Sequence, residues 1–71
     1  MKEITIDTEY ITLGKFLKYA NAVDSGAIAK IVIVNGEVLV NGEVEVRRGK
    51  KLRDGDKVSF DGIDYIIKNE D

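Results

Sequence analysis

The residues with the clearest capacity for chemistry are basic and fall together in one short stretch. Residues 47–53, called the basic segment below, carry a charge of +5 and contain no acid. Its five cations are Arg47, Arg48, Lys50, Lys51 and Arg53. Such a cluster binds the phosphates of a nucleic acid, or it is a solvated loop whose charges keep a strand edge from aggregating. The residues alone leave both interpretations open.

Around this segment the chain is acidic. Residues 1–46 carry a net charge of −3 and residues 54–71 a net charge of −4, so the whole chain has a net charge of only −2. A negative net charge argues against a nucleic-acid partner, whereas the distribution of charge along the chain concentrates the positive residues in one segment. The local cluster is therefore more informative than the isoelectric point.

The residue types that most catalytic sites use are missing. The chain has no His and no Cys, which excludes imidazole and thiolate metal sites, a Cys nucleophile and a Ser-His-Asp triad. Its 13 acids show no EF-hand spacing. We therefore expect a protein that is not an enzyme and that uses no metal or other cofactor.

The length predicts one domain that spans residues 1–71. With no disulfide available, the 44% of hydrophobic residues must form a single core. No apolar run approaches the roughly 20 residues of a membrane span, and Met1-Lys2-Glu3-Ile4 lacks a signal-peptide core. We expect a cytoplasmic monomer that does not enter a membrane.

The first third of the chain predicts a strand and then a helix. Residues 2–7 alternate polar and apolar, which places Ile4 and Ile6 on the inner face of a strand. The next apolar positions recur at helical spacing: Leu13, Phe16, Leu17 and Ala20. Thr12 is the expected N-cap of this helix. Lys15 and Lys18 lie off the apolar stripe and should face solvent.

Residues 26–35 are ambiguous on local evidence. The β-branched run 31–34 favours a strand. Ser25 as an N-cap and Asn35-Gly36 as a C-terminal pair favour a helix. Propensity and flanking residues point in opposite directions here.

Two hairpins are predicted in the second half of the chain. Their turns are Asn41-Gly42 and Asp61-Gly62, residue pairs that tolerate positive φ angles. Leu52, the one large apolar residue of the basic segment, should anchor that segment to the core. The cross-strand pairs expected are Leu39 with Val44, Phe60 with Ile63, and Val58 with Tyr65.

The order of these features resembles the S4 RNA-binding domain, and the resemblance covers nearly the whole chain. It is greatest to the small stand-alone bacterial S4 proteins of the YaaA/YbcJ type, in which Ser-Gly and Arg-Arg-Gly-Lys-Lys-Leu recur. The residues that carry it are Leu13–Lys18, Ser25–Ile33, Asn35–Gly42, Lys51-Leu52 and Gly55-Asp56.

The resemblance implies an α+β fold of the αL-motif type, with two short helices packed on a small, mostly antiparallel sheet. It favours a helix for residues 26–35, and we expect Ile28, Ile31 and Val32 to be buried against the first helix. It also implies non-catalytic binding of structured RNA, foremost ribosomal RNA, in ribosome assembly or RNA quality control.

In S4 domains, basic residues of the two helices and of the segment after the hairpin face RNA. This chain departs from many of them at Thr12-Leu13-Gly14, where Arg-Leu-Asp is common, and at Gly26, where an Arg is common. Two usual RNA-facing positions are thus neutral, so the basic segment gains importance. The residues implied as RNA-binding are Lys15, Lys18, Lys30, Arg47, Arg48, Lys50, Lys51 and Arg53.

Two other functions have features in common with this sequence. Small ubiquitin-like sulfur carriers also have Val-Asn-Gly-Glu and an Asp-Gly-Asp turn, but they require a C-terminal Gly-Gly, and this sequence ends Asn69-Glu70-Asp71. The alternative that stays open is a protein-interaction module without RNA binding. Tyr10 and Tyr19 could stack on an unpaired base, although we expect both to be partly buried instead.

Overall fold

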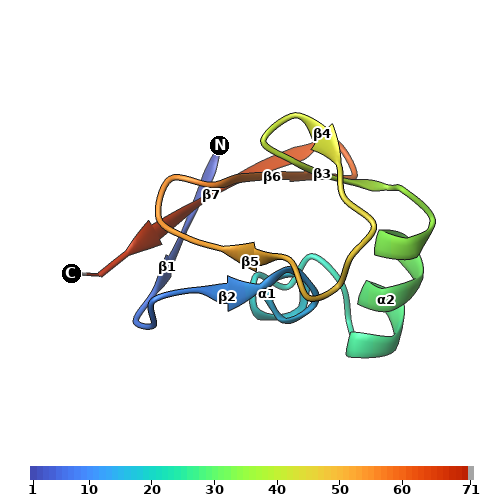
Figure 1. Cartoon of the computed structure of the whole chain (residues 1–71), viewed down its shortest axis with the longest axis horizontal. Coiled ribbons are helices and arrows are strands. Elements are labelled where there is room, and N and C mark those ends of the chain that lie inside the picture. Colours follow the sequence, from blue (N-terminus) through green and yellow to red (C-terminus); the bar gives the residue numbers. More distant parts are fainter. Residues whose placement is uncertain (71) are drawn as a thin grey trace.

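The computed structural model describes residues 1–70 and has the predicted α+β architecture (Figure 1). Two short helices pack with one mostly antiparallel sheet and one small second sheet. The elements are β1 (Lys2–Ile6), β2 (Ile11–Thr12), α1 (Leu13–Tyr19), α2 (Gly26–Val34), β3 (Val38–Val40), β4 (Glu43–Val44), β5 (Lys51–Leu52), β6 (Lys57–Phe60) and β7 (Ile63–Asn69).

The larger sheet has the strand order β1-β7-β6-β3-β4, and β2 pairs with β5 in the smaller one. β1 runs parallel to β7, whereas the other pairs are antiparallel. Both predicted hairpins are confirmed in register: Leu39 lies opposite Val44, Phe60 opposite Ile63, and Val58 opposite Tyr65. Asn41 and Asp61 have φ angles of 52° and 53°, as turns of this kind require.

The apolar stripe of α1 forms the centre of the core. Leu13, Phe16 and Leu17 are fully buried, which confirms the helical spacing. The Phe16 ring meets the Tyr65 ring of β7 edge-on, with the centroids 5.7 Å apart and the planes at 86°. This contact fixes α1 against the larger sheet. The inner face of β1 contributes buried Ile6 and partly buried Ile4.

The segment after Ser25 is a helix, α2, as the resemblance implied. The Ser25 Oγ accepts a hydrogen bond from the Ile28 amide at 3.2 Å, so the predicted N-cap is confirmed. The expected buried face is wrong. Ile28 and Ile31 are 41% and 57% exposed, and the residues that turn inward are Ala29 and Ile33.

The reason for this error is the composition of α2, which is apolar almost all the way round. Periodicity therefore cannot select one face of the helix. Packing against the core decides instead, and it buries Ala29 and Ile33, which lie four residues apart on one side of the helix. Val32 is only partly buried.

Ile33 and Ile31 provide a matched pair for testing the orientation of α2. Replacing the fully buried Ile33 by Ala should lower the free energy of unfolding by roughly 2–5 kcal/mol, because it opens a cavity in a small core. Replacing the exposed Ile31 by Ala should change it by less than about 1 kcal/mol. Urea unfolding of both variants measures the difference, and equal losses would contradict the observed orientation.

Candidate nucleic-acid interface

The basic segment is fastened to the start of α1 through its backbone. The Leu13 amide donates to the Lys50 carbonyl at 2.8 Å, and the Gly14 amide donates to the Arg48 carbonyl at 3.0 Å. The first amides of a helix have no acceptor within the helix, so the basic segment supplies them. Thr12 occupies the predicted N-cap position, but its side chain makes no capping hydrogen bond.

Two further contacts hold the segment in place. The Leu52 side chain is fully buried, which confirms its predicted role as an anchor. β5 pairs with β2, with Leu52 opposite Ile11 and Lys51 opposite Thr12. Ordering a segment of like charges costs free energy. Here the backbone hydrogen bonds, the buried Leu52 side chain and the pairing of β5 with β2 fix the segment before any ligand binds.

Acids outside the cluster neutralise two of its five cations. The Arg47 guanidinium donates from Nε to Glu45 Oε2 at 2.9 Å and from Nη2 to Oε1 at 3.1 Å. The Arg53 Nη1 lies 3.4 Å from Glu9 Oε1. Within residues 1–70, Arg48, Lys50 and Lys51 have no ion-pair partner. These three cations are the ones available to bind an external anion.

Tyr10 belongs to the same surface, although no pattern in the sequence places it beside the basic segment. The Lys51 Nζ lies 4.8 Å from the centroid of its ring, and the Arg53 Cζ lies 5.4 Å from it. Such cation–π contacts orient both basic side chains. They arise because β2 follows Tyr10 directly and pairs with β5.

Two shallow grooves lie on the basic segment, and one of them extends to the helices. One is lined by Arg48 and Gly49 together with Thr12, Gly14, Lys15 and Gly26. The other is lined by the remaining basic residues and again by Gly49. Lys15 of α1 and the first residue of α2 therefore share one continuous surface with the basic segment.

The structure thus brings six of the eight predicted site residues into these grooves. The six are Lys15, Arg47, Arg48, Lys50, Lys51 and Arg53. Lys18 and Lys30 are exposed but do not line either groove. Lys18 lies three residues after Lys15, and Lys30 four residues after Gly26, so each continues a helix face that borders the first groove.

Within residues 1–70, no group of three or more His, Cys, Asp or Glu side chains is arranged to hold a metal ion. The two acids of the Asp-Gly-Asp turn serve the fold instead. Asp54 Oδ1 accepts from the Asn69 amide at 2.7 Å, and Asp56 Oδ2 accepts from the Arg53 amide at 2.8 Å.

Neither α1 nor α2 has the length and apolar character of a membrane-spanning helix.

The Arg47–Glu45 pair can be tested by pH titration. The hydrogen bonds from the Arg47 guanidinium lower the pKa of Glu45 from 4.5 to about 2. A carboxyl whose pKa is lower in the folded state stabilises the fold above its unfolded pKa and loses that contribution as the pH falls toward 2. Arg47→Gln should return the pKa of Glu45 toward 4.5, as followed by NMR of the side-chain carboxyl.

Arg53→Gln is the matched control, since Arg53 pairs with Glu9 rather than Glu45. It should leave the pKa of Glu45 unchanged. If Glu45 titrated alike in the wild type and in Arg47→Gln, the ion pair would not exist in solution.

Comparison with known proteins agrees with this geometry. A protein of Bacillus subtilis (strain 168) named "Probable ribosome maturation protein RlbA" is 54% identical over 59 residues, which cover 83% of each chain. The solution structure of YbcJ from E. coli superposes with a TM-score of 0.73 at 35% identity, covering 96% of this chain and 87% of that one. That structure is described as revealing an αL motif involved in RNA binding.

A family model described as "S4 domain" matches residues 4–68. The match extends from β1 into β7 and so includes both helices, both hairpins and the basic segment. It confirms the resemblance inferred from the ordered motifs. The chain belongs to the S4 domain family.

Proposed function

We propose that this protein binds structured RNA, without catalysing a reaction, through the basic segment and the adjoining start of α1. The observation that carries the proposal is the set of three cations without an ion-pair partner in the described chain, Arg48, Lys50 and Lys51. They stand on a backbone that hydrogen bonds hold to α1. Cations arranged in this way neutralise phosphates and release counterions, which supplies most of the affinity for a nucleic acid.

The eight basic residues have different roles in this proposal. Arg48, Lys50 and Lys51 contact phosphates directly, and Lys15 extends the surface onto α1. Arg47 and Arg53 are held by carboxylates and contribute less. Lys18 and Lys30 lie at the margin and act through the local positive potential.

The relatives favour RNA, and ribosomal RNA in particular, over other polyanions. YbcJ is described as carrying an RNA-binding motif, and the Bacillus subtilis relative is named a probable ribosome maturation protein. We therefore propose a role in ribosome assembly, and with it a cytoplasmic location. We propose further that residues 1–71 act as one S4 unit and as a monomer.

The proposal predicts a loss of affinity that depends on where charge is removed. Arg48→Gln combined with Lys50→Gln should weaken binding to ribosomal RNA and flatten the slope of log K against log salt concentration by about 1.4 to 1.8, the value for two phosphate contacts. Filter binding at several salt concentrations measures both quantities. The fold should be unaffected, because exposed charges contribute little to stability.

Lys2→Gln combined with Lys68→Gln is the charge-matched control. Both residues are exposed and lie on β1 and β7, the parallel pair at one edge of the larger sheet. This variant should keep the wild-type salt slope. If the two double variants bound alike, net charge would govern the affinity and the basic segment would not be the RNA site.

A further inference from the structure

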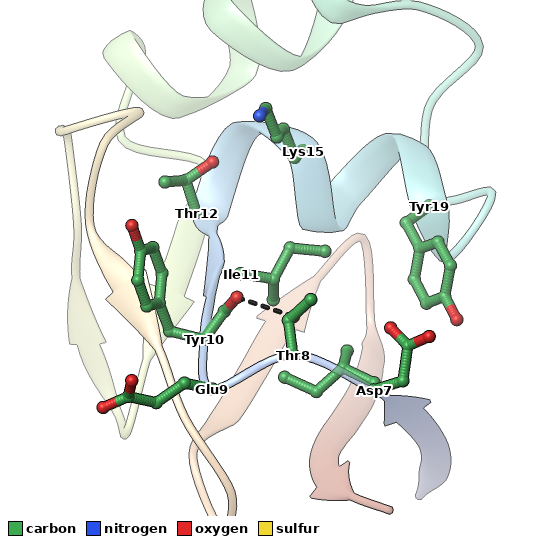
Figure 2. A pocket seen from close by; sticks show the side chains of 9 residues that line it. Asp7, Thr8, Glu9, Tyr10, Ile11, Thr12, Lys15 and Tyr19 are labelled. Carbon is green, nitrogen blue, oxygen red and sulfur yellow. Dashed lines mark hydrogen bonds between the residues drawn. The ribbon is translucent and has the colours of Figure 1, made fainter.

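A pocket adjoins the groove beside Arg48, and Lys15 lies between the two (Figure 2). It is formed by residues 6–12 together with Lys15 and Tyr19 and encloses about 500 Å³, which is within the range of small-ligand sites. Thr12 and Lys15 line both this pocket and the groove beside Arg48. The two hollows are therefore neighbours on one surface.

We propose that this pocket receives one unpaired nucleobase of an RNA whose phosphates lie on the basic segment. The inference rests on the proposed function and adds the part of the RNA that would be recognised. It also gives a role to Asp7 and Tyr19, which do not line the grooves of the basic segment.

The walls of the pocket offer aromatic surface. Tyr10 and Tyr19 are 39% and 58% exposed, so both residues are partly buried, as expected, and still offer ring surface to a ligand. Figure 2 shows them on opposite sides of the pocket, with Thr8 and Ile11 between them. A base inserted between the tyrosines would find an aromatic face to stack on, which is the common way in which proteins hold unpaired bases.

Both rings are positioned before any ligand arrives. The Tyr19 hydroxyl donates to the Thr5 carbonyl at 2.9 Å. Tyr10 is held by the cations of Lys51 and Arg53, 4.8 and 5.4 Å from its centroid. Side chains that are already ordered lose little entropy on binding, which favours a specific ligand over a loose surface contact.

The charges around the pocket favour a base inside it and the adjoining phosphate at its edge. Asp7 lines the pocket, and no hydrogen bond or ion pair within residues 1–70 engages its carboxylate. That group would repel a phosphate but would accept a hydrogen bond from the exocyclic amino group of a base. Lys15 lies where the pocket meets the cationic groove and can hold the adjoining phosphate. Adenine, cytosine and guanine carry the required amino group, and uracil does not.

The test compares two RNA hairpins that are identical except for one bulged adenosine. Wild-type protein should bind the bulged hairpin at least about fivefold more tightly, the lower end of the effect of stacking one base on an aromatic ring. Tyr19→Leu should remove this preference and leave the affinity for the fully paired hairpin unchanged. Tyr19→Phe keeps the ring and should keep the preference. A bulged uridine should be favoured less than the adenosine.

The outcomes separate this inference from the proposed function. Failure to bind either hairpin would overturn RNA binding itself. Equal binding of both hairpins by the wild type, or an unchanged preference in Tyr19→Leu, would overturn the base pocket and leave phosphate binding in place.

Tyrosine fluorescence provides a second readout. The chain has no Trp and three Tyr, and Tyr65 is only 2% exposed, so quenching by a solute reports on Tyr10 and Tyr19. Adenosine monophosphate should quench this signal more strongly than ribose 5-phosphate at the same concentration. Equal quenching would mean that the phosphate alone is bound, which contradicts a base pocket.

Discussion

The two hydrogen bonds from the first amides of α1 to the carbonyls of Lys50 and Arg48 are the constraint on which the functional surface depends. β5, the regular part of the basic segment, comprises only Lys51 and Leu52, so neighbouring strands alone could not fix its course. The hydrogen bonds give the unpaired donors of a helix their acceptors and, at the same time, hold a repelling run of cations beside Lys15. The same two hydrogen bonds thus complete the start of α1 and position the cations.

The distribution of acids completes this arrangement. Glu45 holds Arg47 at one end of the basic segment, and Glu9 holds Arg53 at the other. The repulsion among five close cations is reduced at both ends, while the three in the middle keep their full charge. An acidic chain can therefore present a compact cationic surface, because its carboxylates border that surface rather than occupy it. Within residues 1–70, Lys15 is the one cation outside the basic segment that lines the grooves.

Sequence reasoning succeeded where the determining interactions are local. The stripe of α1 and the registers of both hairpins follow from spacing and turn residues, and the structure has them as predicted. It failed where distant residues decide. The face that α2 buries is set by packing against the core. β2 and β5 are two residues long, too short for the alternation of polar and apolar residues that predicts a strand. The basic cluster was identified by residue type, but the neutralisation of Arg53 by Glu9, 44 residues away, is visible only in the fold.

The parallel pairing of β1 with β7 has a consequence for the order of folding. β1 lies at the edge of the sheet, and β7 is its single neighbour there, with Lys2 beside Tyr65 and Ile6 beside Asn69. Both hairpins close short loops and can form early, whereas this pair closes a loop of nearly the whole chain and is entropically the most expensive. A chain that is synthesised from its N-terminus must therefore hold β1 unpaired until residues 63–69 are available. The pairing of β1 with β7 is therefore among the last contacts to form within residues 1–70, although β1 precedes the other strands in the sequence.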